Sequence, residues 1–467
     1  MVGLFRVERD HLGELHVPAH AYYGVHTARA MTNFAVTGEP IAAWPELVSA
    51  LAAVKAAAAQ ANHALGVLPG AKADAIAAAC TEIRNGLLHE HFVVDLIQGG
   101  AGTSTNMNAN EVICNRALEL LGYPRGEYRF LDPIEDVNRS QSTNDVYPTA
   151  VRLAAFASTT ALLQSVAELR HRLAEKAAAF TGVVKLGRTQ LQDAVPMSLG
   201  QELRGYASSI EDTERRLQAA AAGLLEIGLG GTAVGTALNT PSGYVREVLA
   251  RLAAVTGLPL VPSRDLIAAT ADVGAFVALS GALRLLAVRL GKICNDLRLL
   301  ASGPRAGLAE ITLPAVQAGS SIMPGKVNPV IPELVNQIAF TVMGYDLTVT
   351  LAAEAGQLEL NAFGPIITRS LHQSVKCLDA GCRALADRCV AGITANEQHL
   401  RDNIERSATV ATLLNPLIGY SAANALVTQA MDEGLSIREL VIKRGLLTAE
   451  AFDQLVHSSY SSVNSID

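Results

Sequence analysis

Four polar segments stand out in a chain that is otherwise rich in Ala, Leu and Val. They cover residues 99–108, 138–145, 187–193 and 319–329, and each is expected at an end of a long helix. Ser, Thr and Asn are ordinary helix caps and turn formers, so capping is the default explanation for any single segment. Together the segments supply hydroxyl and amide donors with one ammonium group, namely Thr103, Ser142, Thr143, Asn144, Thr189, Gln190, Ser320, Ser321, Lys326 and Asn328. Such a set suits a small polyanion, for example a dicarboxylate.

The segment 319–329 has the most unusual composition of the four, with two glycines, two prolines and a pair of serines. Proline removes a backbone donor and fixes φ, so this stretch is not expected to form a helix or a central strand. We predict a loop between helices. A loop with hydroxyl, amide and ammonium groups on a rigid helical frame is suited to binding an anion, although a plain surface connection is the alternative.

Long apolar helices are expected to position these segments. The predicted helices cover residues 42–64 and 71–91, a run entered at about Ala109, the stretch after Pro148 up to Phe180, and residues 199–225, 273–300, 330–352 and 366–390. The clearest helical period lies at 273–300, where apolar residues alternate by three and four and Leu285 and Val288 widen the stripe. No alternating strand pattern rivals these helices, so we predict a mainly α fold. Three parts are expected: a mainly helical domain at 1–140, a central long-helix bundle at 141–395, and a small helical domain at 396–467.

Composition argues against several classes of function. The formal net charge is −7 and there is no run rich in Lys and Arg, so nucleic acid is not an expected partner. The six cysteines are scattered without a CxxC pair, so neither a metal site nor a disulfide is expected. Arg152 and Arg284 interrupt the longest apolar runs, so we expect no membrane span and a cytoplasmic location. Only 17% of the residues are charged, which indicates that much surface is buried between subunits of an oligomer.

Several of these segments resemble one known family. The segment 319–329 is similar to the signature loop of the aspartase/fumarase superfamily, a Gly-Ser pair followed by Met-Pro-x-Lys-x-Asn-Pro. That pattern is long and chemically unusual, so its specificity is high. Three further segments resemble the same family, namely GTSTNMNANEV at 102–112, QSTNDVYPTA at 141–150 and GRTQLQDAVPMSLGQE at 187–202. The similarity extends from Tyr22 to about residue 450.

Within that superfamily the details resemble aspartases more than fumarases. The stretch AYYGVHTARAMTNF at 21–34 is similar to the aspartase N-terminal segment, where fumarases usually carry a Trp and a Gln. Ser-Thr-Asn-Asp at 142–145 and VIPELVNQ at 330–337 also follow the aspartase form. Gln190 departs from the wider superfamily, in which many members have His, but some aspartases share this Gln. No histidine at that position therefore acts as acid or base.

The resemblance implies the deamination of L-aspartate to fumarate and ammonia through a doubly charged aci-carboxylate. It makes Ser320 the general base. It places Thr103, Ser142, Thr143 and Ser321 around the β-carboxylate, Lys326, Asn328 and Thr189 at the α-carboxylate, and Asn144, Gln190 and Thr103 at the amino group, and it adds Ile322 to the substrate-binding set. A serine is a poor base unless its oxyanion is stabilised, which the N–H groups of the loop and Lys326 are expected to do.

The resemblance also implies a homotetramer, because the family packs its central helices together and builds each site from three subunits. We therefore expect a D2 tetramer with a multi-helix core. No cofactor is expected to be required, and activation by a divalent cation is left open. Two alternatives to the aspartase function are a fumarate hydratase on the same scaffold and a non-catalytic helical protein. Arg29 and Arg188 are expected to brace loops rather than to contact substrate.

Overall fold

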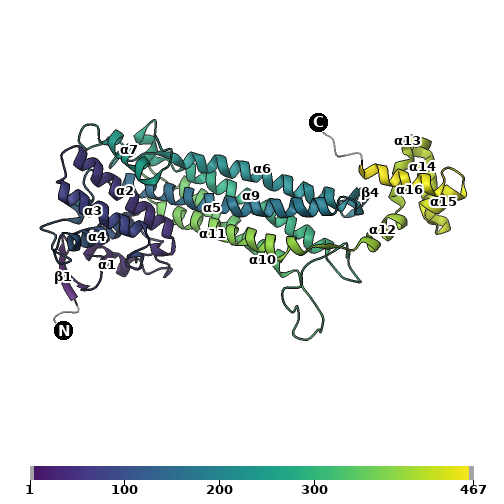
Figure 1. Ribbon diagram of the computed structural model, residues 1–467, viewed down its shortest axis with the longest axis horizontal. Coiled ribbons are helices and arrows are strands. Elements are labelled where there is room, and N and C mark those ends of the chain that lie inside the picture. The colour runs from purple at the N-terminus through teal and green to yellow at the C-terminus, as the bar shows by residue number, and fades with distance from the viewer. Residues whose placement is uncertain (1–4, 462–467) are drawn as a thin grey trace. The chain divides into compact units, whose positions relative to one another are not determined.

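The computed structural model describes residues 5–461, and the chain divides into two compact units (Figure 1). Unit 1 consists of Met1–Leu163, Arg215–Leu285 and Phe340–Leu378. Unit 2 consists of Gln164–Glu214, Leu286–Ala339 and Asp379–Asp467. The expected division into three consecutive domains is not tested by these units and stays a prediction.

Helices dominate both units, as predicted. The α-helices are α1 (Val25–Asn33), α2 (Pro45–Ala64), α3 (Gly70–Arg84), α4 (Thr103–Leu120), α5 (Thr143–Ala179), α6 (Leu199–Ala222), α7 (Tyr244–Thr256), α8 (Leu266–Ala271), α9 (Gly274–Leu300), α10 (Val330–Glu354), α11 (Gly364–Arg388), α12 (Glu397–Arg406), α13 (Asn415–Ile418), α14 (Tyr420–Glu433), α15 (Ile437–Lys443) and α16 (Ala449–Ser461). The five longest helices, namely α5, α6, α9, α10 and α11, each contribute one part to unit 1 and one part to unit 2.

Within residues 5–461 the strands form four two-stranded ribbons. They are β1 (Phe5–Asp10) with β2 (Gly13–Pro18), β3 (Val184–Thr189) with β4 (Gln192–Ser198), β5 (Glu226–Ile227) with β6 (Val261–Pro262), and β7 (Ile311–Thr312) with β8 (Thr394–Ala395). The β5–β6 pair is parallel and the others are antiparallel. These ribbons are too small to form a sheet core, so the core is made by helices.

Unit 1 is organised around α2, which is rich in alanine and buried along most of its length. Its small side chains allow α3, α4 and α7 to pack closely against it (Figure 1). Trp44, directly before α2, stacks on His372 of α11 with 4.8 Å between the ring centroids. The first turns of α4 and α5, which carry two of the polar segments, belong to this unit.

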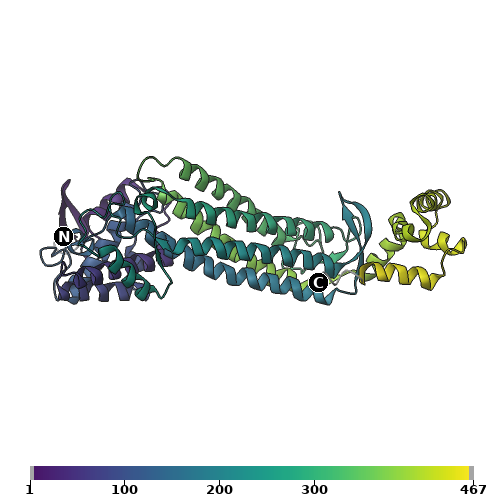
Figure 2. The ribbon, with the colours of Figure 1, turned by 90° about the horizontal axis from the view of Figure 1, so that it is seen from above.

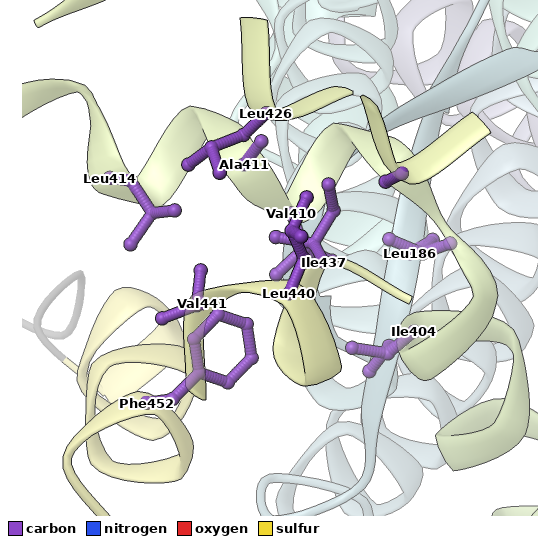
Figure 3. Close-up of a cluster of buried hydrophobic side chains, with 11 residues drawn as sticks. Leu186, Ile404, Val410, Ala411, Leu414, Leu426, Ile437, Leu440, Val441 and Phe452 are labelled. Atoms are coloured by element: carbon purple, nitrogen blue, oxygen red, sulfur yellow. The ribbon is translucent and has the colours of Figure 1, made fainter. Parts of the chain in front are cut away.

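Unit 2 contains the β3–β4 hairpin, the loop between α9 and α10, and the C-terminal helices. Figure 2 shows the hairpin between the end of α5 and the start of α6, which it connects. A buried apolar cluster joins the hairpin to the C-terminal helices (Figure 3), and it consists of Leu186, Ile404, Val410, Ala411, Leu414, Leu426, Ala430, Ile437, Leu440, Val441 and Phe452. The hairpin therefore rests on the C-terminal helices of the same unit.

Three local expectations differ from the structure. Helix α4 begins at Thr103 rather than near Ala109, and α5 begins at Thr143 with Pro148 inside it. The segment 187–193 lies in the β3–β4 hairpin and not at a helix end. On α9, Leu283 and Leu290 are buried as predicted, whereas Val288 is 48% exposed in the isolated chain. The loop at 319–329 is confirmed, because no helix or strand lies between β7 and α10.

Two of the described helices, α5 and α9, are long and apolar enough to cross a membrane by length and composition alone. Half of the apolar window in α5 and 44% of that in α9 are buried within the chain, and core helices of soluble proteins commonly pass this test. The expectation of no membrane span therefore depends on the packing of these helices, and the interruptions at Arg152 and Arg284 do not decide it.

Candidate active site

In unit 1 the first turn of α4 carries Thr103, the first turn of α5 carries Thr143 and Asn144, and Ser142 directly precedes α5. Thr103 is exposed at the start of α4, and its hydroxyl donates to the carbonyl of Gly100 at 2.8 Å. Asn106, one turn further along α4, donates to Thr143 Oγ1 at 3.1 Å and so links the two helix starts. Backbone N–H groups at a helix N-terminus attract anions because several of them lack an intrahelical acceptor. The two helix starts together are suited to a carboxylate.

The approach of α4 to α5 depends on a glycine. Gly102 precedes α4 with φ +94°, and a Cβ atom there would lie 2.5 Å from the ring of Tyr147 on α5. Any larger residue would push the two helix starts apart. The hydroxyl of Tyr147 donates to Thr368 Oγ1 of α11 at 3.0 Å, which holds the ring in place.

A glycine-rich segment at 228–243 packs against the start of α5, a placement that was not predicted from the sequence. The buried carboxylate of Asp145 accepts from the backbone N–H groups of Gly230 and Thr232, both at 3.0 Å. Asn144 donates to the carbonyl of Ala233 at 2.8 Å. Burial raises the pKa of Asp145, while these N–H donors and the charge of Lys55 oppose that rise. The segment therefore fixes the orientation of residues 142–145.

A buried lysine contacts the first residue of the polar segment 138–145. Lys55 of α2 is fully buried, and its ammonium donates to Asn138 Oδ1 at 2.8 Å. Asn106 and Asn110 donate to that oxygen as well, each at 3.2 Å. Burial lowers the pKa of Lys55 to about 7, although the charge of Asp145 favours the protonated form. The sequence signal for this lysine was its place in an alanine-rich helix, where a charged side chain is unusual.

In unit 2 the β3–β4 hairpin presents Thr189 and Gln190 at its turn. Thr189 ends β3, Gln192 begins β4, and the two residues between them have positive φ values, 54° for Gln190 and 63° for Leu191. This is the backbone form of a tight hairpin turn, which normally favours Asn and Gly. Non-glycine residues in this conformation carry strain, and such strain is concentrated at functional sites. Both Thr189 and Gln190 are exposed.

The loop 319–329 surrounds Ser320 with backbone donors. The N–H groups of Ile322 and Met323 donate to Ser320 Oγ at 3.2 and 3.0 Å. Ser320 is half-buried, whereas Ser321, Ile322 and Lys326 are exposed. Hydrogen bonds to a charged oxygen favour its ionised form. These two contacts form a local serine turn, and the same two N–H groups would favour a negative charge on the Ser320 oxygen.

The two ends of this loop are bonded to each other. Gly319 donates its N–H to the carbonyl of Lys326 at 2.8 Å, and the side-chain amide of Asn328 donates to the carbonyl of Gly319 at 2.8 Å. A Cβ atom on Gly319 would lie 2.7 Å from the Lys326 carbonyl oxygen, so only glycine fits. The side chains of Ser320, Lys326 and Asn328 thus lie on a loop whose two ends are hydrogen-bonded to each other.

Comparison with known proteins identifies the family. The family described as Lyase matches residues 13–344, and the family described as Fumarase C C-terminus matches residues 410–459. An aspartate ammonia-lyase from Pseudomonas canavaninivorans is 53% identical over 453 residues, which cover 97% of this chain and 96% of that protein. The chain belongs to the aspartase/fumarase superfamily. It is accordingly a lyase.

Two solved structures of the superfamily match the whole fold. The fumarate lyase:delta crystallin from Brucella melitensis bound to cobalt has a TM-score of 0.94 and 51% identity, covering 97% of this chain and 98% of that one. The class II fumarase from Schistosoma mansoni has a TM-score of 0.93 and 36% identity, and the match covers 99% of this chain and 100% of the fumarase chain. The fold alone therefore does not separate the activities within the aspartase/fumarase superfamily.

The structure divides the predicted site residues of this lyase into two groups. Unit 1 carries Thr103, Ser142, Thr143 and Asn144, and unit 2 carries Thr189, Gln190, Ser320, Ser321, Ile322, Lys326 and Asn328. In the first group Asn106 donates to Thr143 and the N–H of Asn144 donates to Ser142 Oγ, while other hydrogen bonds close the loop that carries most of the second group. Across residues 5–461, no group of three or more His, Cys, Asp or Glu side chains is arranged to hold a metal ion.

Burial of Lys55 predicts how the free energy of unfolding depends on pH. Between pH 7 and 10.5 the unfolded chain binds one more proton than the folded chain, because the pKa of Lys55 falls from 10.5 to about 7 on folding. Stability of the wild type should therefore rise with pH across this window, by about 1.4 kcal/mol per pH unit from this group. In Lys55→Met this contribution is absent, so the variant should have its greatest relative stability near pH 7.

Denaturant unfolding at pH 7, 8 and 9, at one protein concentration, measures this difference. Lys443→Met is the matched control, since the side chain of Lys443 is 62% exposed and its loss should not change the pH slope. Equal slopes for the wild type and Lys55→Met would show that Lys55 keeps its proton on folding.

Proposed function

We propose that the protein catalyses the reversible deamination of L-aspartate to fumarate and ammonia. The observation that carries this proposal is the pair of backbone N–H groups that donate to Ser320 Oγ within the loop 319–329. A serine removes a weakly acidic carbon-bound proton only if its alkoxide is stabilised, and these donors supply that stabilisation. Identity of 53% with an aspartate ammonia-lyase, against 36% with a class II fumarase, favours aspartate over malate.

In the proposed reaction the Ser320 alkoxide takes a proton from the carbon that bears the β-carboxylate. The electron pair of the broken C–H bond moves into that carboxylate and gives the doubly charged aci-carboxylate. The pair then returns to form the C=C bond of fumarate while the C–N bond breaks and ammonia leaves. Ser320 ends as a neutral hydroxyl and must lose its proton before the next turnover.

The hydrogen-bond donors at the starts of α4 and α5 are assigned to stabilise the negative charge that develops on the β-carboxylate. Thr103, Ser142 and Thr143, with Ser321 of the loop, would surround the β-carboxylate. The N-termini of α4 and α5 add their positive ends to these hydroxyls. Removing one preorganised donor of this kind typically lowers kcat by about 10²–10³-fold.

The remaining residues are assigned to the other end of the substrate. Lys326, Asn328 and Thr189 would hold the α-carboxylate, and Asn144, Gln190 and Thr103 the amino group. Ile322 contributes its backbone N–H, which donates to Ser320 Oγ. The half-exposed loop and the exposed hairpin turn leave these side chains accessible to a small substrate.

We propose further that the protein works as a homotetramer. Helix α10 exposes Leu334, Phe340, Leu347 and Leu351, with exposed fractions between 43% and 65%. None of its exposed positions between Leu334 and Leu351 carries a charged side chain. Apolar helix faces of this kind are usually covered by a partner, here further copies of the same chain.

The proposed reaction uses proton transfer and fixed donors only, so a cofactor is not required by its chemistry. Activation by a divalent cation remains a separate proposal that the sequence left open. A small dicarboxylate is the expected substrate class, and a cytoplasmic location stays a prediction.

Incubation of the purified protein with L-aspartate and, separately, with L-malate tests the proposed function. Fumarate is followed by its ultraviolet absorbance and ammonia by a coupled assay. We expect both products from aspartate and no fumarate from malate. Fumarate from malate alone would make the protein a fumarate hydratase instead, and no product from either substrate would favour the non-catalytic alternative.

A further inference from the structure

An ion network lies at the base of the β3–β4 hairpin in unit 2. The carboxylate of Glu310 is completely buried, and it pairs with Lys185 at 2.8 Å and with Arg188 through a hydrogen bond from Nη1. Lys185 is itself buried and pairs at 2.7 Å with Glu202 in the first turn of α6. The Lys185–Glu310 contact is an ion pair whose geometry is not that of a hydrogen bond, so Glu310 Oε2 accepts no hydrogen bond from the described residues. Two cations and two carboxylates thus neutralise one another, with Lys185 and Glu310 buried and Arg188 and Glu202 partly exposed.

The backbone around Glu310 is fixed independently of these charges. Glu310 donates its N–H to the carbonyl of Leu300 at the end of α9, at 2.9 Å, and accepts from the N–H of Asn396 at 3.0 Å. The side chain of Asn396 also donates to the carbonyl of Ala309. Glu310 is therefore a stationary anchor, and the side chains of Lys185 and Arg188 reach toward it from the hairpin.

The network lies between two parts of the proposed active site. Arg188 directly precedes Thr189 and Gln190 at the hairpin turn, while Glu310 lies in the segment that leads through β7 to the loop 319–329. On β3, Leu186 packs into the apolar cluster of the C-terminal helices (Figure 3). The hairpin register shifts between Leu186 and Arg188, and irregularities of this kind re-aim side chains beside active sites.

A buried ion network is weak evidence for stability, because apolar residues of similar volume often stabilise a protein as well or better. The network does, however, require its opposite charges to meet, which restricts how the β3–β4 hairpin can lie against the segment that carries Glu310. We propose that Glu310 is a positioning residue, which acts through Arg188 and Lys185 to fix the turn that presents Thr189 and Gln190 to the substrate. This inference rests on the proposed function of that turn.

The variants Glu310→Gln and Arg188→Met test the proposal. Glu310→Gln keeps the shape and removes the charge, and Arg188→Met keeps the buried Lys185–Glu310 pair and removes only the link nearest the turn. Both should raise the KM for aspartate at least about tenfold while kcat changes less, since the turn is assigned to substrate binding in the ground state. Glu310→Asp, which keeps the charge on a shorter side chain, should recover part of that loss.

Hydrogen exchange of residues 187–193 provides a readout that does not depend on the substrate. Exchange in this segment should become faster in both variants than in the wild type. Leu426→Ala, a truncation within the apolar cluster, is the matched control, because it should lower the Tm without changing the KM. If the wild type lacks aspartate activity, the proposed function fails, and the exchange experiment still decides whether Glu310 holds the turn.

Unchanged KM and unchanged exchange in Arg188→Met would overturn the positioning role, whether or not Glu310→Gln folds. A lower Tm with an unchanged KM in Glu310→Gln would assign the network to stability alone. Faster exchange at 187–193 with a raised KM supports the proposal.

Discussion

Ser320→Ala is expected to lower kcat for aspartate by roughly 10²–10⁴-fold, the usual contribution of a general base. The variant lacks the oxygen that accepts the N–H groups of Ile322 and Met323, so no alkoxide forms. Folding should be unaffected, because the loop is largely exposed and water replaces the lost acceptor. The expected pattern is a lower kcat with a KM for aspartate that changes little.

Steady-state kinetics with aspartate, together with the exchange of its β-hydrogens with deuterated solvent, measures this effect. Met323→Leu is the matched control, since this residue lies in the same loop, is 47% exposed and is assigned no role through its side chain. It should retain activity within a few-fold of the wild type. Turnover that is unchanged in Ser320→Ala would remove Ser320 as the base.

The long helices were predictable because their apolar residues repeat at helical spacing and become buried. Helix α9 runs from Gly274 to Leu300, against the predicted 273–300, and helix α10 was placed equally well. Val288 shows the limit of the apolar pattern, because it lies on the stripe but is 48% exposed in the isolated chain. An apolar residue on a stripe is expected to be covered, but the sequence does not say whether its neighbour is the same chain or another one.

Local structure failed to follow the sequence where tertiary contacts decide it. The polar stretch after Gly102 was predicted as loop, yet it is helix because its asparagines have partners in the fold. Asn108 Oδ1 accepts from Val93 at 2.9 Å, and Asn106 bonds Thr143. The β3–β4 hairpin carried no signal either, because its turn uses Gln190 and Leu191 in place of Asn and Gly.

The site residues came from the resemblance of four segments to one family, and their supports came only from the structure. Arg188 was expected to brace a loop; the structure pairs it with the buried Glu310, and the bracing role stays part of the proposal. Lys55, Asp145 and Glu310 could not be assigned from sequence, because each acts on a segment far from it along the chain. Contacts at such separation leave no periodic trace in the sequence.

Double substitution of Leu347 and Leu351 on α10 by aspartate is expected to abolish assembly and activity together. Both side chains are about 60% exposed in the isolated chain, on the face proposed to meet other copies. A carboxylate buried there without a partner costs several kcal/mol, and two of them exceed the apolar gain of about 1.5–3 kcal/mol per buried leucine. The double variant should be a folded monomer with less than about a hundredth of the wild-type activity.

Sedimentation velocity and activity per chain, measured on the same samples, check this prediction. Leu417→Asp is the matched control, because Leu417 is 58% exposed on α13, outside the long helices, and its substitution should leave the tetramer intact. Full activity at monomer size would contradict a site shared between subunits, and so would full activity of the wild type after dilution to monomers.

Hybrid tetramers separate a shared site from a merely required assembly. Ser320→Ala and Thr143→Val each remove one part of the proposed site, and the two residues belong to unit 2 and unit 1. If they come from different subunits, refolding the two inactive variants together places an intact Ser320 beside an intact Thr143 in about one site in four, by random assembly of a symmetric tetramer. Activity should therefore return in the mixture, whereas a site built within one chain would leave every hybrid inactive.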